Sequence, residues 1–243
     1  MADSATEDSS QHERRISARP YDWPHDGALS RATTALVVID MQNDFCSEDG
    51  YIAHLGYPIT NTRAAIPNIT RLLAAFRAAQ YPVYHTREGH RPDLSTLTSR
   101  ELFRSRNNPS GLGIGDRGPL GRLLVRGEPG HDVIRELYPL PNEPVVDKPG
   151  RSAFAYTDFE LLLKVRGVTK LVVCGVTADV CVHSTIREGN DRGYECLLVE
   201  DATGSVSEEL RRAAVEMMEI EGGIFGAVAR TDDVLAALEK MSD

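Results

Sequence analysis

The sequence predicts an α/β protein with a doubly wound, mostly parallel sheet and helices on both faces of that sheet. Short runs of consecutive apolar residues, typical of strands buried on both sides, alternate along the chain with segments of helical periodicity. Because parallel strands are joined by right-handed crossovers, this alternation favours a sheet covered on both faces. With 243 residues, of which 41% are hydrophobic, the chain can build one sizeable core.

Two parts of unequal size are expected. Residues 1–30 are polar and charged and show no periodicity, which predicts an N-terminal arm, although Tyr21, Trp23 and Pro24 could pin its end to the body. Residues 31–243 are expected to form a single domain, since nothing within them has the composition of a linker between two cores.

The first strand is expected over residues 35–39, a continuous apolar run, and the first helix over residues 62–80. Five apolar residues share one face of that helix: Ile66, Ile69, Leu72, Leu73 and Phe76. A second strand over residues 82–86 leads into the segment 89–129, which is rich in glycine, proline and arginine. Loops of this length in compact domains are usually functional or disordered, and we expect a role in an active site or interface.

The alternation continues to the end of the chain. Strands are expected over residues 144–147, 170–176, 196–200 and 224–229, and helices over residues 157–166, 179–191, 208–221 and 232–241. In open sheets of this kind ligands bind beyond the carboxyl ends of the strands, so the residues that follow each strand are the ones to inspect.

Composition excludes several classes of function. The formal net charge of −9 and the absence of a basic stripe argue against a nucleic-acid partner. No apolar run is long enough to span a bilayer, so no membrane partner is expected. The four cysteines form no C-x-x-C pair and the N-terminus lacks the pattern of a signal peptide, which together favour the reducing cytoplasm.

Three chemically capable side chains follow predicted strands. Asp40 and Lys148 come directly after apolar runs, and Cys181 lies at the start of a predicted helix, where free backbone N–H groups and the helix dipole favour a thiolate. Taken singly, each has a common structural explanation: a turn-forming aspartate, a solvated lysine and a core cysteine. Together they are the base, the cation and the nucleophile that acyl transfer requires.

Their chemistry suggests separate roles. Asp40 can take the proton of the thiol, while Lys148 holds positive charge near both the thiolate and the carboxylate. The backbone N–H groups around Thr177 and Cys181 would then form an oxyanion hole.

No metal and no organic cofactor is expected. Residues 113–118 match G-x-G-x-x-G, but no strand precedes them and Pro119 follows, so the context of a dinucleotide site is missing. His85 and His90 lack the spacing of a zinc motif.

Three motifs resemble the isochorismatase-like cysteine hydrolases over nearly all of the chain after about residue 30. They are Val-Val-Ile-Asp-Met-Gln-Asn-Asp-Phe at 37–45, Asp-Lys-Pro at 147–149 and Gly-Val-Thr-Ala-Asp-Val-Cys at 175–181. The resemblance implies a doubly wound fold and a catalytic triad at Asp40, Lys148 and Cys181. It also implies a cis peptide between Val176 and Thr177, and a homo-oligomer, with a tetramer favoured.

Within this family, residues 85–93, 126–130 and 190–196 are among the segments most similar to biuret hydrolases and their ureide-cleaving relatives. The resemblance implies that Phe45 walls the substrate and that Arg151 hydrogen-bonds its carbonyl, in place of the lysine of biuret enzymes. It also places Glu221 at the substrate, in place of a glutamine. An ionised Glu221 would accept from substrate N–H groups and repel a carboxylate, although a solvated helix end remains an alternative.

The sequence therefore predicts a cysteine amidohydrolase that converts biuret to allophanate and ammonia through a covalent acyl-thioenzyme. Triuret, ureidoacrylate or another small amide are alternative substrates, and Glu221 disfavours ureidoacrylate unless Arg151 meets its acid group. A catalytically silent interaction domain is the alternative outside the enzymes.

Overall fold

The structure, a computed structural model, describes residues 14–239, and within them six strands form one sheet in the order β5-β2-β1-β6-β7-β8. Every neighbouring pair in this sheet is parallel. The strands are β1 (Thr34–Ile39), β2 (Val83–Glu88), β5 (Val145–Lys148), β6 (Lys170–Val176), β7 (Glu195–Gly204) and β8 (Ala227–Ala229). The predicted doubly wound α/β fold is confirmed.

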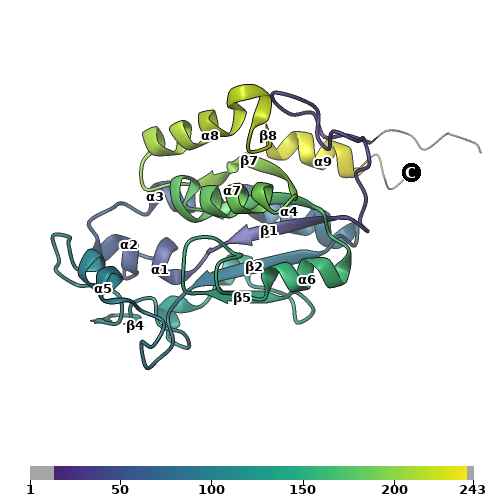
Figure 1. Ribbon diagram of the computed structural model, residues 1–243. Helices are drawn as coiled ribbons and strands as arrows, with labels where there is room; N and C mark the ends of the chain where they lie inside the picture. The colour runs from purple at the N-terminus through teal and green to yellow at the C-terminus, as the bar shows by residue number, and fades with distance from the viewer. Residues whose placement is uncertain (1–13, 240–243) are drawn as a thin grey trace, which may run out of the picture.

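Helices cover both faces of the sheet (Figure 1). On one face α4 (Ile66–Ala78) and α9 (Thr231–Glu239) pack in a cluster that includes Leu36 and Val38 of β1. On the other face α6 (Phe159–Arg166), α7 (His183–Asp191) and α8 (Glu208–Gly223) pack in a cluster that includes Val37 and Ile39. Successive side chains of a strand point to opposite faces, so β1 has to be apolar at every position to serve both clusters.

Several predicted boundaries differ from the structure. The single helix expected over residues 62–80 is divided into α3 (Thr60–Arg63) and α4, with Pro67 in the first turn of α4. The last strand begins at Ala227, three residues later than expected, because the preceding Gly226 has a φ of 130° that an extended strand does not allow.

The carboxyl ends of the strands lie at the end of the molecule that carries the irregular segment 89–129. Figure 1 shows β1 and β2 pointing toward the end of the molecule that carries α1 (Asn43–Cys46), α2 (Tyr51–His54) and α5 (Ser99–Ser105). The segment 89–129 contains α5 and a short antiparallel ladder of β3 (Arg117–Gly118) with β4 (Gly121–Arg122). Two short 3₁₀ turns, η1 (Pro129–His131) and η2 (Arg135–Leu137), lead on to β5.

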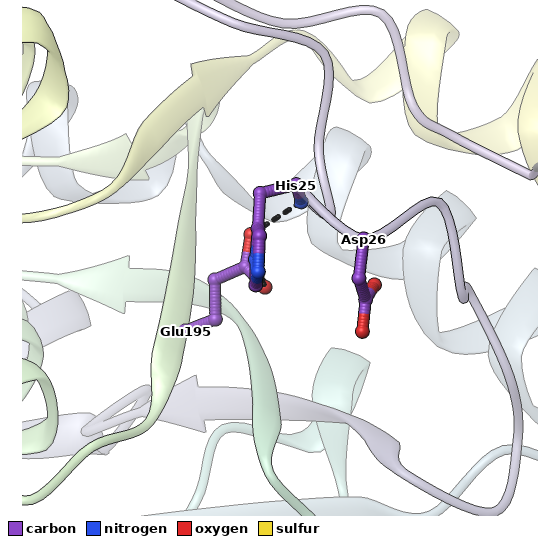
Figure 2. A group of neighbouring side chains, drawn as sticks. All are labelled: His25, Asp26 and Glu195. Carbon is purple, nitrogen blue, oxygen red and sulfur yellow. Dashed lines mark hydrogen bonds and ion pairs between the residues drawn. The ribbon is translucent and has the colours of Figure 1, made fainter.

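Residues 14–30 of the expected arm pack on the body, whereas residues 1–13 lie outside the described part. Ile16 and Trp23 are fully buried, and Arg19 exchanges backbone hydrogen bonds with Val228 of the edge strand β8. His25 contacts Glu195 at the start of β7, with 2.9 Å between Nδ1 and the carboxylate (Figure 2). The backbone hydrogen bonds of Arg19 cover the β8 edge of the sheet, which would otherwise offer unpaired backbone groups.

Within residues 14–239, no helix is both long enough and apolar enough to cross a membrane.

Candidate active site

Four adjacent strands bring four reactive side chains to one point at the carboxyl edge of the sheet. Asp40 follows β1, Glu88 ends β2, Lys148 ends β5, and Cys181 lies in a turn that follows β6. The structure thus brings together the three residues predicted as a triad and adds Glu88, which the sequence analysis missed. We call these four residues the thiol cluster.

The distances within the thiol cluster are those of direct contact. Lys148 Nζ lies 2.7 Å from Asp40 Oδ2 and 3.8 Å from Glu88 Oε2. The Cys181 thiol donates to Glu88 Oε2 over 3.3 Å. Asp40 and Lys148 are completely buried, while Cys181 and Glu88 retain 3% and 5% of their exposure. A buried lysine needs such partners, since an unpaired charge in the interior is very costly.

The thiol cluster contains two carboxylates and one ammonium, and these charges, together with burial, set the pKa of the Cys181 thiol. Burial raises the pKa of Cys181 well above that of a free cysteine, and the charges of Asp40 and Glu88 add to this effect against the opposing charge of Lys148. Burial likewise raises the pKa of Asp40. Burial disfavours the Lys148 charge, but Asp40, Cys181 and Glu88 together hold its pKa above the usual value. The resting cysteine is therefore a thiol, which corrects the thiolate expected from its position at a helix start.

This protonation state predicts slow alkylation of Cys181 at neutral pH. We expect the rate with iodoacetamide to rise nearly tenfold per pH unit from pH 7 to pH 9, because only the thiolate reacts and its fraction grows with pH below the thiol pKa. Peptide mass spectrometry of Cys181 after timed exposure measures this rate. A rate that is already maximal at pH 7 would show a preformed thiolate instead.

The turn that holds Cys181 is wider than an α-helical turn. Residues Ala178–Val182 form one π-helical turn, η3, and α7 begins directly after it, so the helix predicted from residue 179 has an irregular start. Such π turns are frequent at functional sites. The peptide bond between Val176 and Thr177 is cis, as predicted. Gly175 precedes it with a φ of 114°, and a side chain there would collide with the backbone of Ile39 on β1.

Buried hydrogen bonds fix the Asp40 carboxylate and the backbone of Glu88. The Thr86 hydroxyl donates to Asp40 Oδ1 over 2.6 Å. The Gln42 amide clamps the backbone of Glu88, accepting from its N–H at 2.6 Å and donating to its carbonyl at 3.0 Å. Buried hydrogen bonds of this kind hold their members in one geometry.

Arg151 lies beside the thiol cluster and ties it to the long segment. Its guanidinium forms an ion pair of 2.5 Å with Glu101 of α5, and Glu101 also binds Arg104 at 3.1 Å. Burial disfavours the charge of Arg151, but Glu88 and Glu101 hold its pKa above the usual value. Arg151 therefore stands between the buried Glu88 and a helix of the 89–129 segment, consistent with the expected active-site role of that segment.

The other two predicted substrate contacts, Phe45 and Glu221, do not belong to the thiol cluster. Phe45 is buried in α1, within the apolar cluster on the α4 face, whereas Cys181 belongs to the cluster on the other face. Glu221 is exposed at a kink near the end of α8, close to Gly223, which faces Pro20 and Tyr21. Figure 1 shows α8 running back from the carboxyl end of β7 to the start of β8. Because Glu221 is near the end of α8, it lies toward the opposite edge of the sheet from the thiol cluster of its own chain.

The thiol cluster also has ligand atoms that could hold a metal ion. One atom each of Asp40, Glu88 and Cys181 lies within 4.8 Å of the others. Lys148 already places a positive charge in contact with both carboxylates. A divalent cation would have to displace this ammonium, so the geometry favours lysine as the cation of the site.

Comparison with known proteins identifies relatives over most of the chain. Residues 34–233 match the isochorismatase domain. The ureidoacrylate amidohydrolase RutB of Methylobacterium radiotolerans is 34% identical over 87% of this chain and 83% of its own, and that of Pantoea ananatis is 32% identical over 94% and 90%. A crystal structure of a cysteine hydrolase from Pseudomonas syringae pv. phaseolicola superposes with a TM-score of 0.74 at 28% identity, covering 87% of this chain and 95% of that one.

Proposed function

This chain belongs to the isochorismatase family, and from that premise we propose that it is a cysteine amidohydrolase that cleaves a C–N bond of a small ureide. The observation that carries the proposal is the buried contact of the Cys181 thiol with a carboxylate that shares the Lys148 ammonium. A thiol held against charged groups inside a fold is costly, and acyl transfer explains why the fold keeps it.

The proposed reaction begins with attack of Cys181 Sγ on the carbonyl carbon of the ureide. Asp40 accepts the thiol proton as the S–C bond forms and delivers it to the departing nitrogen as the C–N bond breaks. Backbone N–H groups of Thr177 and Cys181 stabilise the oxyanion, and Lys148 balances the charge of its carboxylate partners throughout. Water then hydrolyses the acyl-thioenzyme, without a metal or an organic cofactor.

Ureidoacrylate is the substrate that we favour. The sequence argued against this substrate because an ionised Glu221 would repel its carboxylate. Glu221 lies away from the thiol cluster of its own chain, so this repulsion does not act there. Arg151 and Arg104, by contrast, lie on the side of the cluster covered by α5, where a guanidinium suits the carboxylate of such a substrate. The two relatives described above carry the name of this activity.

Biuret is a second candidate, and one observation favours it. Arg151 is already paired with Glu101, so the side of the cluster that it occupies is electrostatically balanced and suits a neutral ureide. Several motifs also resemble those of biuret hydrolases.

A substrate panel distinguishes these candidates. Purified protein is expected to release ammonia from ureidoacrylate and more slowly from biuret and triuret, both before and after dialysis against a chelator. The matched variant Arg151→Gln should raise KM for ureidoacrylate by about 10–100-fold, the cost of a lost charged hydrogen bond, and raise KM for biuret less. If biuret is the better substrate, the order of the two candidates is reversed. Inactivity on all three compounds would refute the proposal and favour a silent interaction domain.

A further inference from the structure

Glu88 is a buried carboxylate that the proposed acylation step does not use. It is 5% exposed, it contacts the thiol of Cys181, and Gln42 fixes its backbone. Neither a turn nor a helix cap accounts for it, because it is the last residue of a central strand. Keeping a second carboxylate beside Asp40 costs stability through their mutual repulsion, which a residue without function would not justify.

The carboxylates of Asp40 and Glu88 are contacted by different hydrogen-bond donors. Asp40 contacts the Thr86 hydroxyl through Oδ1 and the Lys148 ammonium through Oδ2. Neither donor is consumed when Cys181 is acylated. Glu88 Oε2 instead contacts the thiol itself, with Lys148 at the longer distance of 3.8 Å. Acylation removes the S–H and leaves this oxygen without its closest donor.

The donor that can replace the S–H is a water molecule. Glu88 Oε2 lies 3.3 Å from the sulfur, and the thioester carbon would be bonded to that sulfur. A water bound to this oxygen would therefore lie within attacking distance of the carbon. Glu88 also adjoins Arg151, whose side chain is 30% exposed, whereas Asp40 is completely enclosed. Because Glu88 keeps 5% exposure and Asp40 keeps none, Glu88 is the carboxylate of this pair that we expect entering water to contact.

We infer that Glu88 is the general base of the second half-reaction, the hydrolysis of the acyl-thioenzyme, an inference that rests on the proposed function. Water donates a proton to Glu88 as its oxygen bonds to the thioester carbon. The C–S bond then breaks, the acid product leaves, and the proton on Glu88 passes to the Cys181 thiolate. This transfer regenerates the thiol in contact with Glu88 that the structure shows.

The inference predicts that Glu88→Gln forms the acyl-enzyme but releases it slowly. With p-nitrophenyl carbamate as probe, we expect a burst of about one nitrophenolate per active site, followed by a steady rate about 10²–10⁴-fold below that of the parent protein. Intact-mass spectrometry should detect the carbamoyl adduct on Cys181. The stronger nucleophile hydroxylamine should restore turnover of Glu88→Gln at least about tenfold, a rescue that a misfolded site would not give.

Glu143→Gln is the matched control. It neutralises another buried glutamate, which pairs with Arg77 and His85 and does not belong to the thiol cluster. This variant should keep the parental steady rate and accumulate no more acyl-enzyme than the parent protein, even if its folding stability falls.

Two outcomes would overturn the inference: a steady rate of Glu88→Gln within threefold of the parent, or loss of its burst together with the steady rate. Loss of the burst would assign Glu88 to acylation. If the parent protein turns over the carbamate but no ureide, the proposed function fails while the test of Glu88 still gives its result.

Discussion

Replacing Cys181 by serine is expected to lower the turnover of a ureide by about 10⁴-fold or more. Serine nearly preserves the size of the side chain and its contact with Glu88, but its hydroxyl is far less acidic than a thiol. The carboxylates that can deprotonate a thiol during attack are too weak as bases for an alcohol. Steady-state ammonia release, with single-turnover analysis of the adduct by mass spectrometry, measures the loss.

The same substitution should not destabilise the fold. Serine is as neutral as the resting thiol, is nearly the same size and can keep the hydrogen bond to Glu88, so the unfolding free energy should change little. Cys174→Ala is the informative control, because Cys174 is a fully buried core residue away from the thiol cluster. It should cost about 1 kcal/mol of unfolding free energy and leave activity unchanged. Serine at position 181 with more than a tenth of parental activity would exclude cysteine nucleophilic catalysis.

The sequence was sufficient to predict where the site forms. The carboxyl ends of parallel strands meet at one edge, so Asp40, Lys148 and Cys181 could be brought together because each follows a predicted strand. Their protonation could not be predicted in the same way. A helix start favours a thiolate, but the burial of Cys181 and the number of carboxylates around it appear only in three dimensions.

Glu88 was missed because its strand does not have the pattern of a buried strand. β2 consists of Val-Tyr-His-Thr-Arg-Glu, and its polar residues obscure the point at which the strand ends. The polar residues have specific partners, such as Thr86 with Asp40 and Arg87 with Asp147. A search for the last residue of every strand, apolar or not, would have found Glu88 beside Lys148, its partner in the β2–β5 register.

The position of Glu221 follows from the same topological rule. A helix that connects two parallel strands runs against them, so a residue at its end lies at the amino edge of the sheet, away from the ligand site. Glu221 lies near the end of α8, which finishes at Gly223, four residues before β8 begins at Ala227, and it is such a residue within its own chain. The role predicted for Glu221 at the substrate came from a motif resemblance. The order of the elements is stronger evidence for where Glu221 lies within its own chain.

Lys148→Met is expected to have the largest effect on stability, about 3–5 kcal/mol of unfolding free energy, together with loss of activity. Methionine fills a similar volume, but Asp40 and Glu88 then face each other in the interior without a cation. Urea unfolding of the purified variant at fixed pH measures the loss against the parent protein.

The pH dependence of the Lys148→Met variant tests the electrostatic origin of the loss. Burial already raises the pKa of Asp40, and removal of the ammonium raises it further. A carboxyl group whose pKa is higher in the folded than in the unfolded state stabilises the fold at low pH, and this stabilisation is lost as pH rises through the folded value. The variant should therefore lose less stability at pH 5 than at pH 8.

A second substitution completes the test. Adding Asp40→Asn to Lys148→Met removes one of the two uncompensated charges, so the double variant should be more stable than Lys148→Met alone at pH 8 and should lose most of its pH dependence. Simple additivity of the two losses, or a loss for Lys148→Met below about 1 kcal/mol at both pH values, would mean that the ammonium does not hold these carboxylates. Recovery of stability without recovery of activity would separate the two functions of Lys148: it neutralises buried charge in the resting fold, and it balances charge at Cys181 during acyl transfer.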